Sequence, residues 1–193
     1  MAKSDLSTAA ISYRQDLAFE TRWNGRTYRS QLEARWAAFF EEMGWCAEYE
    51  PGNAGLWLPD FVIRTEHQRE LYVEVKPITY PDAATQQKML ANLQSSGRMP
   101  CDAILLGHMH TGDRLHRQIG WISTEEGRAS GAKWSNAYLA AYADGAIGLV
   151  DGEVGEDRIL KRNEHPLINR AATPGARAWG KAGDAVRYSK VIG

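Results

Sequence analysis

The sequence predicts an α/β fold in which helices flank a central mixed β-sheet, followed by a C-terminal extension. Helical periodicity appears over residues 30–43 and again over 82–96, whereas the segments between and after them are rich in branched and aromatic residues or alternate in polarity. The chain's 193 residues, 44% of them hydrophobic and 24% charged, suit one compact domain rather than a disordered or fibrous chain.

The first predicted element is an amphipathic helix over residues 30–43, whose apolar residues recur at helical spacing. Ser30 and Glu33 form an S-x-x-E capping-box pattern at its start, and Gly44 is placed to end it. The remaining elements follow from strand-like runs and from breakers such as Pro81 and Gly97. We expect strands at 46–50, 56–64, 70–76 and 103–106, a helix at 82–96, a further strand at 119–123, a flexible link at 127–133, a helix at 134–143 and a helix-like segment at 174–188.

The predicted order is therefore helix, strand, strand, strand, helix, strand. Residues 56–64 and 70–76 are expected to form a hairpin through the polar turn between them. We divide the chain into an N-terminal arm (1–28), a core (29–125) and a C-terminal extension (126–193).

Several protein classes are unlikely on composition. No apolar run approaches the roughly 18 residues that span a bilayer, so we expect no membrane partner. The first residues lack a secretory signal, and the only two cysteines, Cys46 and Cys101, cannot build a disulfide framework. A cytoplasmic protein, in a bacterial or phage-infected cell, is the resulting expectation.

The charges are unevenly distributed although the net charge is only −1. Residues 41–74 hold eight acidic and two basic residues, and residues 158–190 hold eight basic and two acidic ones. This asymmetry suits a chain that binds metal ions in one region and phosphates in another, but each run is also compatible with an ordinary solvated face.

The most informative residues are two carboxylates and a lysine, at Asp60 and in Glu74-Val75-Lys76. Side chains alternate along a strand, so Glu74 and Lys76 share one face and Val75 points to the other. If the two strands pair, Asp60 comes alongside Glu74. Two like charges are unfavourable unless a cation lies between them, and Mg²⁺ takes carboxylate and carbonyl oxygens. We predict that Asp60, Glu74 and the Val75 carbonyl hold Mg²⁺, for which Mn²⁺ can substitute, and that Lys76 stabilises charge during phosphodiester hydrolysis.

These residues, in this order, resemble the PD-(D/E)xK nuclease superfamily and its small phage-type or resolvase-like members. Pro59-Asp60 matches the PD element, Glu74-Val75-Lys76 matches E-x-K, and residues 30–40 are similar to the first core helix, whose acidic residue often helps to hold metal. The match covers about residues 30–107. It implies a restriction-endonuclease-like core, a catalytic role for Asp60, Glu74 and Lys76, and a supporting catalytic and metal-binding role for Glu33.

Other candidates have an ordinary structural explanation beside the functional one. Glu33 is either a metal ligand or only a helix cap. The resemblance implies that a polar residue near the start of the predicted helix at 82–96 contacts phosphate or water. The structural alternative is that Gln86, Gln87 and Lys88 are ordinary exposed residues of this helix. Trp57 would stack on a base or serve in packing. The basic C-terminal segment would contact phosphates or dock on the sheet. The nucleic-acid-binding candidates are Gln86, Gln87, Lys88, Trp57, Arg177 and Lys181.

The function expected from these features is a Mg²⁺-dependent DNA nuclease, with endonuclease and exonuclease action both open, acting in recombination, repair or phage genome processing. Branched, flap or end structures are the expected DNA partners, RNA is an open alternative, and a homodimer is compatible with the resemblance. The alternative, from a different class, is a nucleic-acid-binding or assembly subunit that keeps the fold without catalysis.

Overall fold

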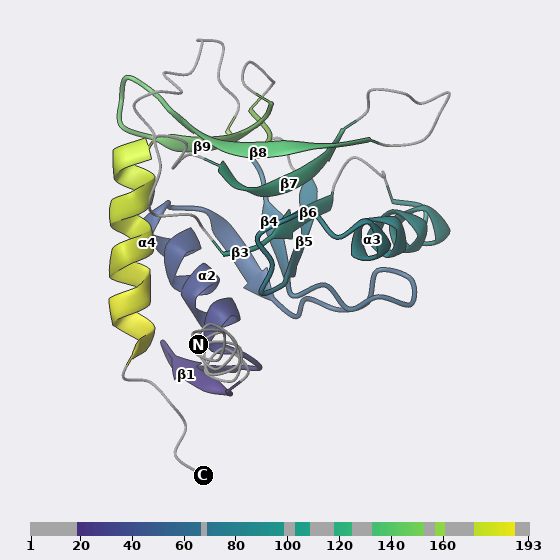
Figure 1. Ribbon diagram of the computed structural model, residues 1–193, viewed down its shortest axis with the longest axis horizontal. Coiled ribbons are helices and arrows are strands. Elements are labelled where there is room, and N and C mark those ends of the chain that lie inside the picture. The colour runs from purple at the N-terminus through teal and green to yellow at the C-terminus, as the bar shows by residue number, and fades with distance from the viewer. Residues whose placement is uncertain are drawn as a thin grey trace, which may run out of the picture.

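The computed structural model describes residues 19–66, 69–98, 103–108, 118–124, 133–152, 157–160 and 172–187. Within those ranges the chain forms nine strands and three helices (Figure 1). The strands are β1 (Thr21–Trp23), β2 (Arg26–Tyr28), β3 (Cys46–Tyr49), β4 (Phe61–Arg64), β5 (Glu70–Val75), β6 (Ala103–Leu106), β7 (Gln118–Thr124), β8 (Lys133–Ala141) and β9 (Ile147–Asp151). The helices are α2 (Gln31–Glu42), α3 (Ala83–Ser95) and α4 (Ala172–Arg187).

Seven strands form one mixed sheet in the order β3-β4-β5-β6-β7-β8-β9, which is also their order in the chain. All neighbours are antiparallel except β5 and β6, which are parallel because α3 carries the chain back between them. The carboxyl ends of β5 and β6 therefore lie at the same edge of the sheet. The structure is thus an α/β fold built on a mixed sheet.

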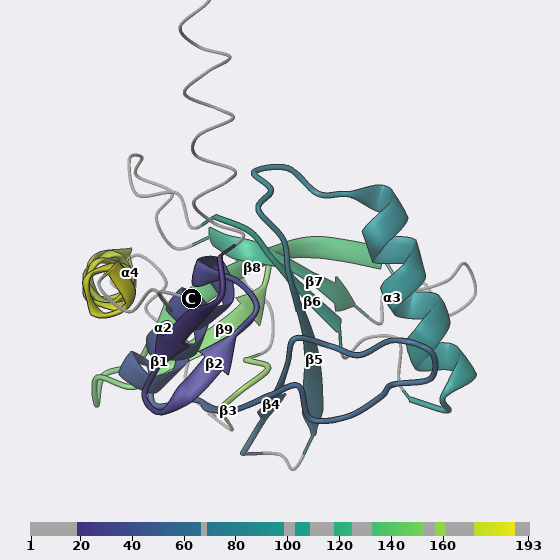
Figure 2. The ribbon, with the colours of Figure 1, turned by 90° about the horizontal axis from the view of Figure 1, so that it is seen from below.

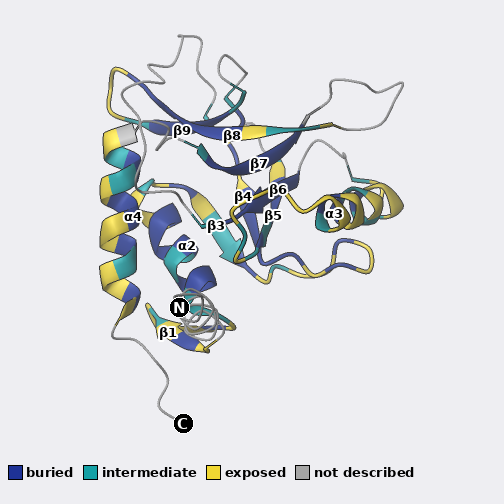
Figure 3. Cartoon of the chain, viewed as in Figure 1, coloured by how far each residue is buried: buried dark blue, intermediate teal, exposed yellow. Residues whose placement is uncertain are grey.

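Different helices cover the two faces of this sheet, with α2 and α4 on one side and α3 on the other (Figure 2). Strand β5 shows how alternation divides its side chains between the faces. Leu71, Val73 and Val75 join the core beneath α2 and α4, whereas Tyr72 packs in a second cluster with Met89 of α3. Figure 3 shows that α2 is largely buried, while α3 keeps a broad exposed side.

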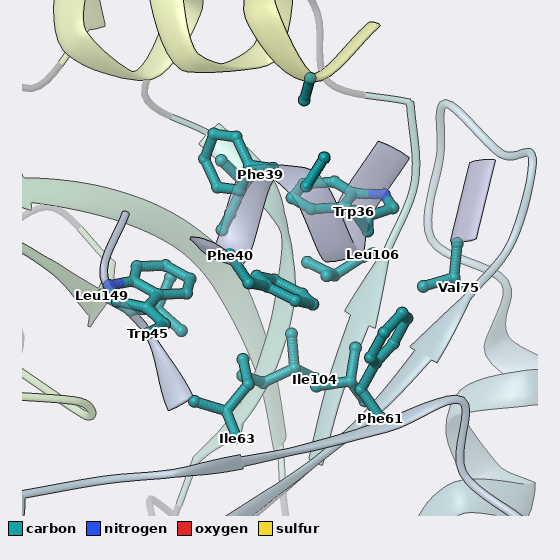
Figure 4. Packing of buried hydrophobic residues seen from close by; sticks show 14 of the residues in the cluster. Trp36, Phe39, Phe40, Trp45, Phe61, Ile63, Val75, Ile104, Leu106 and Leu149 are labelled. Atoms are coloured by element: carbon teal, nitrogen blue, oxygen red, sulfur yellow. The ribbon is translucent and has the colours of Figure 1, made fainter. Parts of the chain in front are cut away.

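The larger core is aromatic and fixes α2 on the sheet (Figure 4). The ring centroids of Trp36 lie 5.2 Å from Phe39 and 4.6 Å from Trp179 of α4. The Trp36 Nε1–H also donates to the backbone oxygen of Gly107 at 3.0 Å, just after β6. Aromatic packing and this buried hydrogen bond together hold the amino-terminal half of α2 beside the carboxyl end of β6.

Helix α2 begins as the sequence predicts. Ser30 is its extended N-cap, with φ −143°, and its hydroxyl accepts a hydrogen bond from the Glu33 N–H at 3.1 Å. Gly44 follows the helix with φ +71°, a left-handed conformation that glycine adopts without steric cost. The predicted helix at 82–96 and the predicted strands at 46–50, 70–76, 103–106 and 119–123 are likewise present, within one or two residues at each end.

The predicted helix at 134–143 is wrong, because this segment is strand β8. Its run of alanine and leucine has good helix propensity, yet it pairs with β7 on one side and β9 on the other. Leu139 and Ala140 are both fully buried, as residues of a strand covered on two faces are. Tertiary pairing therefore overrides local propensity here. The strand predicted at 56–64 is also shorter than expected and begins only at Phe61.

The segment before α2 contains a hairpin that the predicted irregular arm over 1–28 does not include. Strands β1 and β2 pair antiparallel around Asn24-Gly25, whose φ angles of +46° and +78° are those of a tight two-residue turn. Tyr28 is buried in the core beneath α2. Residues 1–18 of the expected arm, and most of the link expected at 127–133, lie outside the described residues.

The boundary expected at residue 126 falls between β7 and β8, which are hydrogen-bonded neighbours in one sheet. The helix-like segment expected at 174–188 is α4, and it packs against α2 through Trp179. In the described part of the chain, no helix combines the length and apolarity that crossing a membrane requires.

Candidate functional site

Asp60 directly precedes β4, and Glu74 lies near the end of the neighbouring strand β5. The two strands are antiparallel and their pairing ends at Phe61 opposite Val73, and the Asp60 carboxyl group is close enough to Glu74 for the charge of Glu74 to raise its pKa. The Asp60 N–H donates to the Val73 oxygen at 2.9 Å, and its Oδ2 accepts the Val75 N–H at 2.7 Å. One hydrogen bond from its backbone and one to its side chain therefore fix the Asp60 carboxylate at the carboxyl end of β5.

Glu74 is held by a partner on each carboxylate oxygen. Its Oε1 lies 2.6 Å from the Lys76 Nζ, and its Oε2 accepts the Trp57 Nε1–H at 2.7 Å. The Glu74 side chain is 12% exposed, whereas that of Lys76 is 42% exposed. The carboxylate is thus fixed inside the site, while the lysine beside it remains in contact with solvent.

Glu33 reaches the same region from the first turn of α2. Its Oε1 accepts the Ser30 hydroxyl at 2.9 Å, and its Oε2 accepts the Tyr49 hydroxyl at 2.6 Å. The reciprocal carboxylate-to-amide bond of a capping box is replaced here by a bond to the Ser30 hydroxyl. Glu33 is buried and serves as part of the helix cap, and it also lies close enough to Asp60 to act on its ionisation.

Arg29 joins these carboxylates, and the sequence analysis did not single it out. Its guanidinium forms ion pairs with Asp60, with Glu50 at 3.0 Å and with Glu33 at 3.8 Å. Its backbone N–H donates to the Tyr49 hydroxyl at 3.1 Å. The sequence does contain a signal for this role. Arg29 lies four residues before Glu33 and directly before the N-cap, a spacing that predicts an ion pair with the acid of the first turn.

The electrostatics of the site reflect three carboxylates sharing a small buried space. Burial raises the pKa of Asp60 to about 7, and the charges of Glu74 and Glu33 add to this effect against the favourable Val75 N–H and Arg29. Burial alone would lower the pKa of Lys76, but its hydrogen bond to Glu74 and the charges of Glu74 and Asp60 raise it. Lys76 is therefore a stable ammonium beside two acidic groups.

The donor set suits a hard divalent cation bound by few protein ligands. Asp60 and Glu74 supply carboxylate oxygens, and the Val75 carbonyl lies at the same strand end, while the Val75 side chain is buried in the core. No group of three or more His, Cys, Asp or Glu side chains in the described ranges is arranged to hold a metal alone. Mg²⁺ is typically held by one or two carboxylates together with waters and phosphate oxygens. Burial and the charge of Glu74 raise the pKa of Asp60, and a bound cation would offset both effects.

The structure separates the candidates on α3 and its surroundings. Gln86 is buried and its Nε2 has no hydrogen-bond partner among the described residues, whereas Gln87 and Lys88 are exposed. Trp57 is only 5% exposed and packs against Tyr72, so its ring is a packing element and its indole N–H supports Glu74.

Arg177 and Lys181 lie apart from the Asp60 region. Both are exposed on α4, and the Lys181 Nζ lies 3.0 Å from Glu42 Oε2 at the end of α2. Figure 2 shows α4 on the outer side of α2, which stands between α4 and β5. The fold therefore brings together Glu33, Asp60, Glu74 and Lys76, and leaves these two basic residues on another surface.

Comparisons with protein-family models, with curated proteins and with solved structures found no match to this chain. The function is therefore inferred from the chemistry of Asp60, Glu74, Lys76 and the residues that hold them.

Proposed function

We propose that the chain is a Mg²⁺-dependent DNA nuclease with a restriction-endonuclease-like core. The observation that carries this proposal is the proximity of Asp60, which accepts the Val75 N–H, to Glu74, whose Oε1 lies 2.6 Å from the Lys76 ammonium. Two neighbouring carboxylates repel each other, and a strongly perturbed acidic group beside a partly exposed lysine marks a candidate functional site. The proposed setting is recombination, repair or phage genome processing.

The arrangement of elements supports the same proposal. An acid-bearing helix, α2, precedes the hairpin of β4 and β5 that carries Asp60 and Glu74, and α3 then leads to the buried strand β6 parallel to β5. This is the order that the PD-(D/E)xK resemblance implies. Fold likeness alone does not specify an activity, so the proposal depends on the side chains at the strand ends.

In this proposal Asp60, Glu74 and the Val75 carbonyl would hold the divalent cation, with Glu33 oriented by Ser30 and Tyr49 in support. When bound, Mg²⁺ supplies positive charge to a phosphate oxygen and makes a water more acidic. Arg29 contacts Asp60 through one oxygen, so it would have to yield some of this contact as the cation binds.

Lys76 would orient the attacking water and stabilise negative charge on the phosphate as the water oxygen bonds to phosphorus and the water releases a proton to solvent. The bond from phosphorus to the leaving oxygen then breaks, and that oxygen takes up a proton from solvent. Because Glu74 fixes the ammonium at 2.6 Å, Lys76 loses little side-chain freedom when substrate binds.

The test is cleavage of a supercoiled plasmid and of a branched DNA with Mg²⁺ or Mn²⁺. We expect Asp60→Asn and Lys76→Ala to reduce cleavage on the order of 100-fold or more. Arg64→Ala, which removes an exposed basic residue from the end of β4 away from Asp60, is the matched control and should cleave as the unchanged protein does. DNA binding in EDTA should persist in all variants.

A protein that binds DNA but never cleaves any form of it with either metal would be a non-catalytic nucleic-acid-binding or assembly subunit. An equivalent RNA substrate, assayed in parallel, decides between deoxyribonuclease and ribonuclease activity. Cleavage of both strands would require two such sites, as a homodimer provides.

A further inference from the structure

A hollow of about 360 Å³ lies beside the carboxyl ends of β5 and β6, outside the cluster of carboxylates. Its walls come from the segment after Lys76, from the residues following β6, and from β7 and β8. Its lining includes Tyr80, His108, Gln118, Trp121 and Asn136. This volume is at the lower end of the range of small-molecule sites, which combine aromatic side chains with a few polar groups.

The backbone connects the hollow to the candidate catalytic lysine, because Tyr80 follows Lys76 by four residues. Lys76 N–H donates to the Leu106 oxygen at 2.9 Å, and His108 N–H donates to the Ile78 oxygen at 3.1 Å. The segment leading from Lys76 to Tyr80 is therefore tied to the end of β6. Under the proposed function, we take a strand whose phosphate lies at Lys76 to continue along this segment toward the hollow.

Two glycines allow the backbone segments around the hollow to pack closely against each other. A Cβ on Gly107 would lie 2.3 Å from the Ile78 oxygen, and one on Gly120 would lie 2.3 Å from the Leu105 oxygen. Both glycines line the hollow. The segment carrying Tyr80 is thus held in one place by backbone contacts that a larger residue would disrupt.

Tyr80 is the most informative side chain of the hollow, because its exposed fraction is 81%. A large aromatic ring exposed to water gains little by packing, yet every nucleobase offers a flat face on which such a ring can stack. Trp57, the aromatic residue nearest to Glu74, is buried and cannot take this role.

The opposite wall supplies amide groups in a fixed orientation. The Gln118 Nε2 donates to the Asn136 Oδ1 at 3.1 Å, and the Asn136 Nδ2 donates to the Tyr138 hydroxyl at 3.1 Å. Each amide nitrogen has a second hydrogen that these two hydrogen bonds do not use, and the side-chain carbonyl of Gln118 is an acceptor. Neighbouring amide donors and acceptors are the groups that can hydrogen-bond to the edge of an unpaired base.

We propose that this hollow is a nucleobase subsite, in which an unpaired base stacks on Tyr80 and presents its edge to Gln118 and Asn136. The inference deepens the proposed nuclease function and rests on it for the path of the strand past Lys76. It assigns the substrate class as nucleic acid that is single-stranded, or locally unpaired, beside the cleaved bond.

The test is equilibrium binding, by fluorescence anisotropy in EDTA, of a labelled single-stranded 12-mer and of the matching duplex. We expect tighter binding of the single strand. Tyr80→Ala should weaken it about tenfold, a typical loss for one stacked base, and Tyr80→Phe should restore it. The double variant Gln118→Ala/Asn136→Ala should weaken it as well, with a smaller effect on the duplex. A 12-mer RNA of the same sequence tests whether the sugar matters.

Leu56→Ala is the control, because Leu56 is 98% exposed and does not line the hollow. Equal affinity for single strand and duplex, or unchanged single-strand affinity in Tyr80→Ala, overturns the subsite. The proposed function fails separately, if no metal supports cleavage even though single-strand binding depends on Tyr80. Cleavage that requires Lys76 but is indifferent to Tyr80 and to both amides leaves the nuclease and removes the subsite.

Discussion

The indole Nε1 of Trp57 and the Oε2 of Glu74 are 2.7 Å apart, and this hydrogen bond orients the carboxylate whose other oxygen meets Lys76. Trp57 lies in the segment between β3 and β4, so a residue outside the sheet positions a residue within it. The geometry of the candidate catalytic lysine therefore depends on a buried aromatic side chain.

Replacing Trp57 by Phe keeps a ring and removes the N–H donor. We expect a loss of about 1–3 kcal/mol in the free energy of unfolding, since a largely buried carboxylate loses a partner, together with reduced cleavage. Urea unfolding measures the first effect. Trp134→Phe is the matched control, because the buried Trp134 Nε1 has no acceptor among the described residues. Equal losses in the two variants would show that ring size, not the hydrogen bond, matters.

The stability of the fold should fall as pH rises through the titration of Asp60. Its pKa is raised from 3.8 to about 7, so the folded chain holds a proton that the unfolded chain has released. Stability from this group is present at low pH and is lost between about pH 4 and 7. The full shift corresponds to about 4 kcal/mol as an upper value.

Asp60→Asn removes this titration. We expect its free energy of unfolding to decline less between pH 4.5 and 8 than that of the unchanged chain, with urea denaturation at several pH values as the measurement. Parallel pH profiles for the two proteins would contradict the raised pKa.

Arg29→Gln tests whether the guanidinium and a divalent cation compete for Asp60. Without Arg29, three acidic side chains lose a shared positive partner, so the melting temperature at pH 8 in EDTA should fall. Mn²⁺ should then raise the melting temperature more than it does for the unchanged chain, because ligand binding to the folded state stabilises it.

Arg64→Gln is the control for this prediction. Arg64 pairs with Glu48 at 2.7 Å, but both side chains are more than a third exposed, so little change in stability is expected. If Mn²⁺ stabilised Arg29→Gln and the unchanged chain to the same extent, competition at Asp60 would be ruled out.

Gly107→Ala should destabilise the chain by about 1–3 kcal/mol, since the added methyl group overlaps the Ile78 oxygen. Gly180→Ala is the opposite case. Gly180 lies within α4 with nothing within 4 Å of a built Cβ, so alanine should add about 0.5–1 kcal/mol through helix propensity. Thermal unfolding of both variants tests the contrast, and a neutral Gly107→Ala would mean that the segment 76–80 can shift without cost.

Much of the sheet and of the carboxylate pair could be predicted because both depend on local pattern. Alternation over residues 70–76 assigns Glu74 and Lys76 to one face, and the short turn after β4 makes antiparallel pairing with Asp60 the simplest topology. The segment over β8 could not be assigned in this way. Its residues favour a helix when considered alone, and only pairing with β7 and β9 makes it a strand.

Arg29 and Trp57 show why the support of the site was harder to predict. Arg29 binds acids that follow it by 4, 21 and 31 positions, and no sequence period connects such distances. For Trp57 the sequence leaves both stacking and packing open, because aromatic residues serve both, and its burial identifies it as a packing residue. The Asn24-Gly25 hairpin, by contrast, had a recognisable turn signal between two short β-prone triplets.

Arg29 gives the chain an internal counter-ion for acids contributed by the first turn of α2, by the end of β3 and by the start of β4. Many metal-binding domains reach their native state only once the ion arrives, since nothing else neutralises their ligands. Here a residue encoded in the same polypeptide offsets part of that charge, so the acids of the proposed site have a positive partner whether or not a cation is bound.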